Sequence, residues 1–304
     1  MPHLHPTVTP TDATLGATIT GIDLASMDEA TWRIVESAFH AHAVLIFPGQ
    51  TLSESAQIDF AGRFGDIERL RPDPRALAVS ISNENPDGTV AKPREFRFKT
   101  QRGNEGWHTD SSYMPLAAKA SVLCAQVVPP SGGETEWADM RAAYDALDDA
   151  TRERISDLAA YHSLYQSQAK IGYEIKSGAG YGYHTKGAPL RPLVKTHPVT
   201  GRKSLFIGRH AYRIPGLDDD EAQGLLDDLV TSACRAPRTL SHRWRVGDVV
   251  IWDNRCVLHR ARPYDFSQPR TMRHVRVAGD PASELAATGR DERAGAFEPS
   301  ASNR

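Results

Sequence analysis

The chain has 304 residues, of which 40% are hydrophobic, 24% charged and 8% aromatic, and this composition is that of a folded globular chain rather than a disordered one. Its 36 Lys and Arg residues nearly balance its 38 Asp and Glu residues, so the net charge indicates neither a nucleic acid nor a membrane surface as a partner. No apolar run approaches the roughly 20 residues that span a bilayer, and the first residues, MPHLHPTVTP, lack a signal-peptide pattern, so we expect a cytoplasmic protein.

The first part of the chain alternates predicted strands and helices. Alternating apolar residues at 17–24 predict a strand, and Ser26 followed by Glu29 is the capping-box signature of a helix start. An apolar strand follows at 44–47, and a second helix is expected from about Ser53. We expect these two helices to cover one face of a sheet.

Two long polar segments interrupt the middle of the chain. Residues 70–105 are rich in Pro, Arg and Lys and contain only a short predicted strand at 79–82, and residues 167–190 are rich in Gly, Ser and Lys. Long loops beside a compact domain often form lids or binding loops. Between the two segments we expect a strand at 120–128 and two helices, at about 139–147 and 150–160.

The last third of the chain is predicted to consist mainly of strands. A strand at 205–207 and a helix from about Asp218 come first, and alternating segments then predict strands at 242–246, 249–252, 257–260 and 273–277. We find no internal repeat and no linker, so we expect one β-rich α+β domain over residues 1–280, with helices packed outside it. Residues 281–304 lose the hydrophobic pattern and are expected to be a disordered tail.

Histidine rather than cysteine is the candidate metal donor. The chain has too few cysteines, and these are too scattered, for a disulfide framework or a zinc cluster, so we expect free thiols at Cys124, Cys234 and Cys256. Of the twelve histidines, His108 has a carboxylate, Asp110, two residues later. Residues i and i+2 of an extended segment point to the same face, so this pair can hold one metal ion. The similarly spaced His40 and His42 fall in a predicted helix, where such side chains diverge.

A second segment strengthens this metal-site hypothesis. An apolar predicted hairpin at 247–260 delivers His259 near a strand end, and Arg270 follows eleven residues later. Two histidines and one carboxylate on one face form the triad that binds non-haem Fe(II) and leaves positions open for other ligands. An arginine behind such a site suits the remote carboxylate of a cosubstrate, which it can hold through two hydrogen bonds.

Three stretches of this sequence resemble the taurine dioxygenase/2,4-dichlorophenoxyacetate dioxygenase family of Fe(II)/2-oxoglutarate enzymes. They are WHTDSSYMPLAAKASVLCAQVVPPSGGETEWADMRAAYDAL, LVKTHPVTGRKSLFIGRHA and RWRVGDVVIWDNRCVLHRARPYD, and the similarity runs from about residue 10 to 280. Within the family the chain is most similar to the aryloxyalkanoate branch, especially the (S)-phenoxypropionate dioxygenases, through QSQAKIGY and HVRVAGDPASE. The resemblance implies a double-stranded β-helix (jelly roll) and O2 as a reactant.

The resemblance also implies a role for individual residues. It places the Fe(II) ligands at His108, Asp110 and His259 and the 2-oxoglutarate contacts at Thr135 and Arg270, and Asn104 matches a position near the substrate. The family's second arginine, which holds the substrate anion, is replaced here by His274. The anchor of the substrate anion is therefore open among several groups, namely His274 itself, Arg209, Arg276, Arg102 and Lys99.

The implied reaction is hydroxylation of an anionic aryloxyalkanoate beside its ether oxygen, which yields a phenol and a keto acid together with succinate and CO2. One alternative is a taurine-type alkylsulfonate dioxygenase that releases sulfite, and His274 in place of the arginine argues against it. Another is a non-catalytic cupin-like binding module or a zinc hydrolase, and Thr135 and Arg270 argue against both. We expect a small anionic substrate as the partner, and a homo-oligomer.

Several neighbouring residues have two interpretations. The tryptophans at 107, 244 and 252 are expected mainly to pack in the core, since large aromatic side chains usually do. Tyr113 either lines the pocket or is an ordinary strand tyrosine. Asp253 and Asn254 either shape the turn before His259 or orient that ligand.

Overall fold

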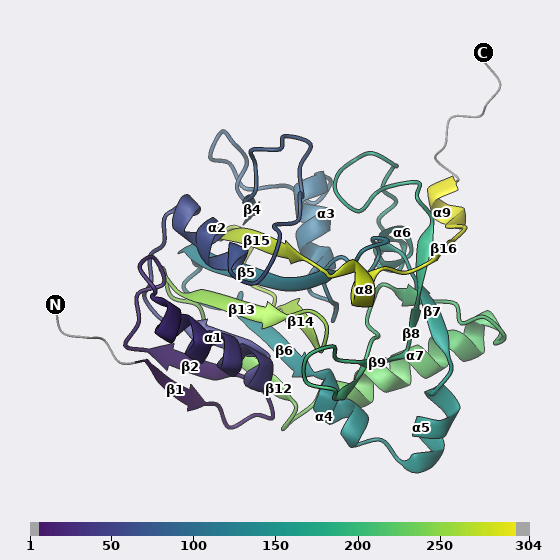
Figure 1. The fold of residues 1–304 in the computed structure, drawn as a ribbon. Coiled ribbons are helices and arrows are strands. Elements are labelled where there is room, and N and C mark those ends of the chain that lie inside the picture. Colours follow the sequence, from purple (N-terminus) through teal and green to yellow (C-terminus); the bar gives the residue numbers. More distant parts are fainter. Residues whose placement is uncertain (1–5, 296–304) are drawn as a thin grey trace.

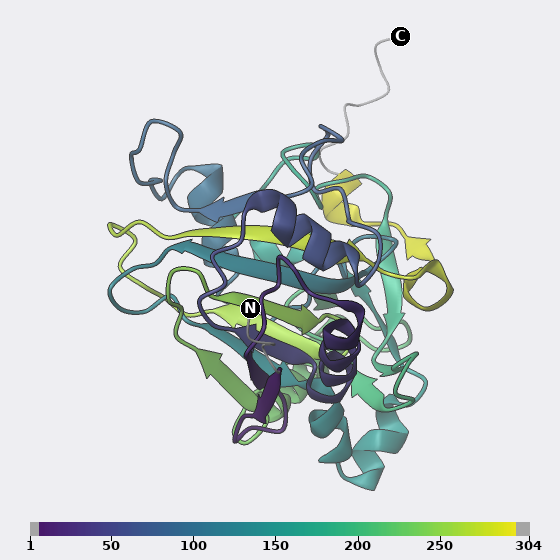
Figure 2. The same cartoon turned by 60° about the vertical axis from the view of Figure 1, so that its left-hand side comes forward.

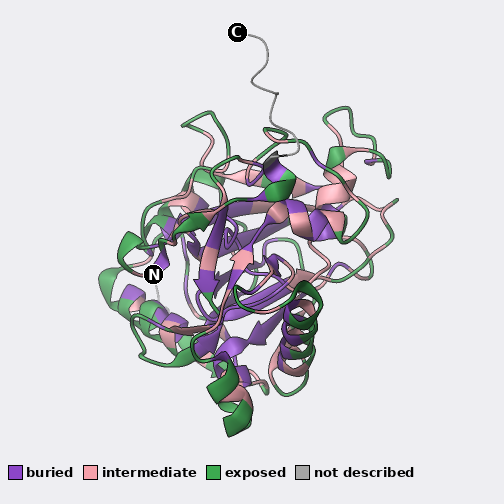
Figure 3. Ribbon diagram, turned by 90° about the vertical axis from the view of Figure 1, so that its right-hand side faces the viewer, coloured by how far each residue is buried: buried purple, intermediate pink, exposed green. Residues whose placement is uncertain are grey.

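The computed structural model describes residues 6–295 (Figure 1). Its architecture is mixed α/β, with sheets at the centre and helices on the outside. Within residues 6–295, no helix is both long and apolar enough to cross a bilayer. The buried residues follow the central strands, whereas the exposed ones cover the loops and the outer helix faces (Figure 3).

A seven-stranded sheet forms the largest layer. Its strand order is β1-β2-β3-β13-β5-β15-β4, and all neighbouring strands are antiparallel except β2 and β3. The strands are β1 (Thr7–Pro10), β2 (Ala17–Thr20), β3 (Val44–Phe47), β4 (Val79–Ser82), β5 (Ala118–Val127), β13 (Val249–Asp253) and β15 (Thr271–Ala278).

Helices α1 (Glu29–His42) and α2 (Glu54–Gly62) cover one face of this sheet, as expected (Figures 1 and 2). Side chains of β5 alternate between the two faces, so Val122 packs under the helices and Leu123 faces the other way. The predicted cap of the first helix was wrong. Asp28 caps it by accepting the Thr31 N–H at 2.8 Å, whereas Ser26 donates its hydroxyl to Asp23 at 2.7 Å.

A three-stranded sheet packs against the other face. It consists of β12 (Thr239–His242), β6 (Thr135–Asp139) and β14 (Val257–Ala261), in that order. Trp137, Trp244 and Trp252 meet in the core between the two sheets. The predicted packing role is confirmed for Trp244 and Trp252, which are buried.

Most of the remaining elements pack around a third core. They include two further sheets. The first has the strand order β11 (Ala211–Tyr212), β7 (Ala159–His162), β8 (Ala188–Pro192) and β16 (Thr288–Gly289). The second consists of β10 (Lys203–Leu205) and β9 (Val194–Thr196). Helices α4 (Met140–Asp145), α5 (Asp149–Ile155) and α7 (Asp219–Ala233) contribute to this core. Leu225, Leu229 and Ala233 share the buried face of α7.

Most differences from the prediction concern polar segments. The strands expected at 44–47 and 79–82 are confirmed, but α3 (Phe96–Gly103) lies within the first expected loop and α6 (Leu164–Ala169) extends into the second. The helix expected at 150–160 ends at Ile155 and is followed by β7, and the strand expected at 242–246 is displaced to β12. The buried residues of α3 are Gln101 and Gly103, so this helix has no apolar stripe that its sequence could reveal. The cysteines are free thiols, as expected.

The C-terminal prediction was wrong for residues 281–295, while residues 296–304 lie outside the described part of the chain. Residues 281–295 contain α8 (Pro281–Glu284), β16 and α9 (Glu292–Gly295). Polar contacts hold much of this segment, because buried Glu284 pairs with Lys195 and Asp291 accepts the Ser163 hydroxyl at 2.6 Å, and Ala294 adds an apolar contact.

We predict that Glu284→Gln lowers the free energy of unfolding by about 3 kcal/mol, because it leaves the Lys195 charge unpaired in a buried site. The matched control is Glu221→Gln, which breaks the exposed ion pair with Arg154 and should cost less than about 1 kcal/mol. Urea denaturation of the two variants measures both values. Equal effects would contradict a structural role for the buried pair.

Candidate metal centre and the cavity around it

Two histidines that are distant in sequence are joined by their backbones. His108 donates its N–H to the His259 carbonyl at 2.9 Å, and His259 donates to the His108 carbonyl at 2.7 Å. Residues paired in this way across an antiparallel bridge project their side chains to the same side. The two imidazole rings accordingly lie 4.1 Å apart between centroids.

Asp110 completes the cluster predicted from the sequence. One potential ligand atom from each of His108, Asp110 and His259 lies within 4.8 Å of the other two, and all three residues are buried. His108 uses Nδ1 to donate to the Gly106 carbonyl at 2.7 Å, which leaves the Nε2 lone pair free. Asp110 Oδ2 lies 3.8 Å from His259 Nε2.

The electrostatics suit a divalent metal. Burial lowers the pKa of His108 to about 3 and that of His259 to about 4, so both are neutral at physiological pH. Burial alone would raise the pKa of the Asp110 carboxyl, but Arg276 and the nearby histidines outweigh it and hold that pKa below its usual value. Two neutral imidazoles and one carboxylate are the donor set of a non-haem Fe(II) site, so these residues fit the metal that the sequence predicts.

The three residues open into a cavity of about 390 Å³. Its wall contains the predicted residues Asn104, Thr135, Arg209, Arg270, His274 and Arg276. It does not contain Arg102, which pairs with Glu105 at 2.6 Å, nor Lys99, which lies 5.5 Å from the centre of the Tyr173 ring. The structure therefore gathers all of the predicted site residues except Arg102 and Lys99.

Thr135 and Arg270 have hydrogen-bond donors available for an anion. Arg270 is buried and donates Nε–H to the Gly133 carbonyl at 3.2 Å, and no carboxylate among residues 6–295 pairs with it. Burial lowers the pKa of this guanidinium, as expected for a charge without a partner. Thr135 accepts the indole N–H of Trp244 at 2.9 Å, so its own hydroxyl hydrogen remains available to an anion.

Two of the candidate substrate anchors, Arg276 and His274, lie beside Asp110 of the metal centre. Arg276 donates Nη2–H to Asp110 Oδ1 at 2.8 Å and Nη1–H to Ser111 Oγ at 2.9 Å. Burial, followed by the charge of Arg276, lowers the pKa of His274 to about 3, so this side chain is neutral. Neither group offers an uncompensated positive charge to a substrate.

Arg209 differs from these two groups. Its guanidinium donates to the Gly103 carbonyl, to the Ser167 carbonyl at 2.7 Å and to Gln168 Oε1 at 3.1 Å. In the described part of the chain no carboxylate pairs with it, and burial lowers its pKa to about 10. Arg209 therefore presents an uncompensated charge in the cavity wall.

Sequence reasoning missed several lining residues. The polar segments supply aromatic and amide side chains to the cavity wall, which are Phe96, Gln101, Gln168, Tyr181 and Tyr183, and Arg97 also reaches the wall. Tyr113 lines the cavity, which favours the first of its two interpretations. Aromatic residues within otherwise polar loops were the available signal. The strands add aliphatic residues, so the wall suits an apolar body with an anionic head.

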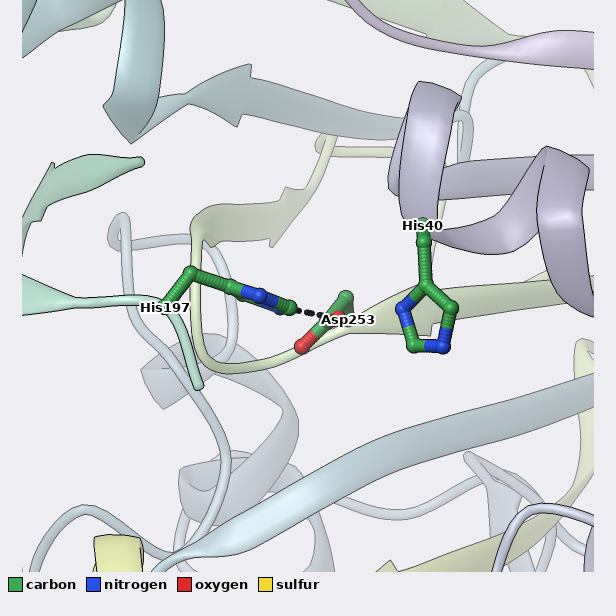
Figure 4. Close-up of side chains that lie close together, drawn as sticks. All are labelled: His40, His197 and Asp253. Atoms are coloured by element: carbon green, nitrogen blue, oxygen red, sulfur yellow. Dashed lines mark hydrogen bonds and ion pairs between the residues drawn. The ribbon is translucent and has the colours of Figure 1, made fainter. Parts of the chain in front are cut away.

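A second cluster, formed by His40, His197 and Asp253, also has metal-site spacing (Figure 4). The ligand atoms of Asp253 and His197 are already hydrogen-bonded, and only His40 keeps a nitrogen, Nδ1, without a partner. Both Asp253 oxygens accept from Arg255, Oδ2 also accepts from His197 Nε2 at 3.0 Å, and His197 Nδ1 accepts two backbone N–H groups. We interpret this cluster as a polar support of the turn that precedes His259.

Comparisons with known proteins point in one direction. The family model described as "Taurine catabolism dioxygenase TauD, TfdA family" matches residues 7–278. An "(S)-phenoxypropionate/alpha-ketoglutarate-dioxygenase" of Delftia acidovorans is 53% identical over 92% of this chain and 97% of that protein. An "Alpha-ketoglutarate-dependent 2,4-dichlorophenoxyacetate dioxygenase" of Cupriavidus pinatubonensis is 41% identical over 82% and 88%. A crystal structure of AAD-2 with Mn(II) and N-oxalylglycine matches with a TM-score of 0.84 at 37% identity, over 94% of this chain and 100% of that one.

We predict that the free energy of unfolding of the metal-free protein falls as the pH drops from 6.5 towards 4. Unfolded histidines bind protons near pH 6.5, whereas folded His108 and His259 do so only near pH 3 and 4, so the unfolded state binds more protons in this interval. Each histidine contributes a slope of up to about 1.4 kcal/mol per pH unit. Urea denaturation across this range should give a shallower slope for His259→Leu, and an unchanged slope would contradict the assignment.

Proposed function

The chain belongs to the TauD, TfdA family of dioxygenases, and from this premise we propose that it is an Fe(II)- and 2-oxoglutarate-dependent dioxygenase of small anionic aryloxyalkanoates. The observation that carries the proposal is the convergence of His108, Asp110 and His259 on a cavity that also contains Thr135 and Arg270. The identity to phenoxypropionate and dichlorophenoxyacetate dioxygenases supports the substrate class. Cytoplasmic location and homo-oligomeric assembly stay predictions from the sequence.

We further propose that the fold is a double-stranded β-helix. The seven-stranded and three-stranded sheets would be its two walls, with the tryptophan-rich core between them. Both walls contribute to the cavity, since β6 and β14 carry Thr135 and His259, and β15 carries His274 and Arg276. The match to AAD-2 supports this assignment.

His108, Asp110 and His259 would hold Fe(II), which with 2-oxoglutarate and O2 supplies the oxidation of a substrate C–H bond. Arg270 would bind the far carboxylate of 2-oxoglutarate through two charged hydrogen bonds, and Thr135 would donate its hydroxyl to the same group. Their burial excludes water from that carboxylate, which strengthens both contacts.

We propose Arg209 as the anchor of the substrate carboxylate. Its charge has no carboxylate partner within residues 6–295, while Arg276 is bound to Asp110 and His274 is neutral. The aromatic and aliphatic wall would hold the aryl group, with Asn104 beside it. Hydroxylation of the carbon next to the ether oxygen then gives an unstable hemiacetal-type product, which divides into a phenol and a keto acid.

The other two candidate functions are less well supported. A taurine-type sulfonate dioxygenase would need an anion-binding arginine at position 274, where this chain has a histidine. The largely apolar wall also suits an aryl group better than a small alkylsulfonate. A zinc hydrolase or a non-catalytic module has no use for the unpaired Arg270 beside the metal ligands.

We predict that anaerobic addition of Fe(II) and 2-oxoglutarate produces a visible charge-transfer band, and that His108→Ala does not form it. Arg270→Gln should form the band only at 2-oxoglutarate concentrations about 10- to 100-fold higher, because it loses two charged hydrogen bonds. Arg102→Gln, which changes an arginine outside the cavity wall, is the matched control and should behave as the wild type. No band in the wild type would refute the proposed function.

A substrate panel tests the substrate class. We predict succinate formation coupled to phenol release with aryloxyacetates or one enantiomer of the 2-aryloxypropionates, and little turnover of alkylsulfonates and sulfate esters. Arg209→Gln should raise KM for the aryloxyalkanoate about 10-fold or more while leaving the 2-oxoglutarate KM near its original value. Sulfite release from an alkylsulfonate as the fastest reaction would overturn the aryloxyalkanoate assignment.

A further inference from the structure

Both oxygens of the Asp110 carboxylate are held by neighbouring side chains. Oδ1 accepts Nη2–H of Arg276 at 2.8 Å, and Oδ2 accepts the hydroxyl of Ser121 at 2.6 Å. Ser121 lies on β5 directly between Trp252 of β13 and Arg276 of β15 in the register of the large sheet. Three adjacent strands therefore deliver these groups to the same side of the sheet.

The hydrogen bonds on the Oδ2 side run in one direction. The amide Nδ2 of Asn254 can only donate, and it donates to Ser121 Oγ at 3.0 Å, so the Ser121 hydroxyl hydrogen must point to Asp110. Asn254 cannot flip, because its Oδ1 accepts the indole N–H of Trp252 at 3.0 Å, and an indole N–H is never an acceptor. The chain is thus Trp252 to Asn254 to Ser121 to Asp110.

These contacts determine which lone pairs of Asp110 remain. Each carboxylate oxygen has about two acceptor positions. By this count each oxygen keeps one position, but Oδ1 faces the Arg276 guanidinium, whereas Oδ2 is the oxygen that lies 3.8 Å from His259 Nε2. A metal ion between the ligands would therefore meet Oδ2 rather than both oxygens.

We propose that Ser121 and Asn254, supported by Trp252 and opposed by Arg276, are positioning residues that present Asp110 to the metal through Oδ2 alone. A carboxylate that binds through one oxygen occupies one coordination position, which leaves three positions open beside the two histidines. The Asn254 interpretation made from sequence is thereby altered, because Asn254 orients Asp110 and not His259. The inference rests on the proposed metal site.

The test is the Mn(II) affinity of the metal-free protein, measured by calorimetry without 2-oxoglutarate. Ser121→Ala should weaken binding about 10- to 100-fold, because partners that orient a metal ligand typically contribute this much. Ser112→Ala is the matched control, since Ser112 is also buried near Asp110 but its hydroxyl has no partner. Its affinity should equal that of the wild type.

Two further measurements separate positioning from folding. Adding Asn254→Ala to Ser121→Ala should weaken Mn(II) binding much less than Asn254→Ala does alone, because both residues act through one chain. The visible absorption of bound Co(II) should change in Ser121→Ala and not in Ser112→Ala, because the coordination by Asp110 changes.

The outcomes distinguish this inference from the proposed function. Wild-type Mn(II) affinity and an unchanged Co(II) spectrum in Ser121→Ala would overturn the positioning role, and so would a lower Tm of the metal-free variant with unchanged affinity. If His108→Ala binds Mn(II) as tightly as the wild type, the metal site itself is elsewhere and both proposals fail.

Discussion

The two backbone hydrogen bonds between His108 and His259 are the contact on which the rest of the site depends. They fasten a segment outside the main sheets to β14, and they place Asp110 beside the same imidazoles. Strand β14 pairs with β6, which carries Thr135, so one small sheet fixes a candidate metal ligand and a candidate cosubstrate contact together. The large sheet contributes His274 and Arg276 to the cavity wall, and Arg270 directly precedes its strand β15.

Burial then sets the charge of the centre. It keeps His108, His259 and His274 neutral, so Asp110 and Arg276 are the charged groups in immediate contact with one another. Their charges cancel, and a divalent cation placed among these ligands would leave an excess of positive charge in a poorly hydrated space. Such a site favours an anionic chelating ligand over a neutral one, because a low dielectric strengthens the attraction.

The sequence predicts the apolar elements and the candidate site residues better than the polar contacts that hold helices and ligand side chains in place. Strands with continuous apolar runs, such as 44–47, and the spacing of His108 and Asp110 are local signals. By contrast, α3 is a helix because tertiary contacts hold its polar residues, and residues 281–295 are ordered by the Lys195–Glu284 pair. The role of Ser121 depends on the register of three strands, which no local pattern encodes.

Arg209 and Arg270, which have no carboxylate partner within residues 6–295, would allow one cavity to distinguish two anions in the function that we propose. An unpaired charge in a partly buried wall is costly, so Arg209 and Arg270 are best accounted for by ligands that neutralise them. They are supported by different elements, Arg270 by Gly133 and Asn83 and Arg209 by the segment from Gly103 and by α6. A dianion that also binds the metal would neutralise Arg270, and a monoanion with an apolar body would neutralise Arg209. With neutral His274 in place of the family's second arginine, Arg209 is the charge that we propose for the substrate carboxylate.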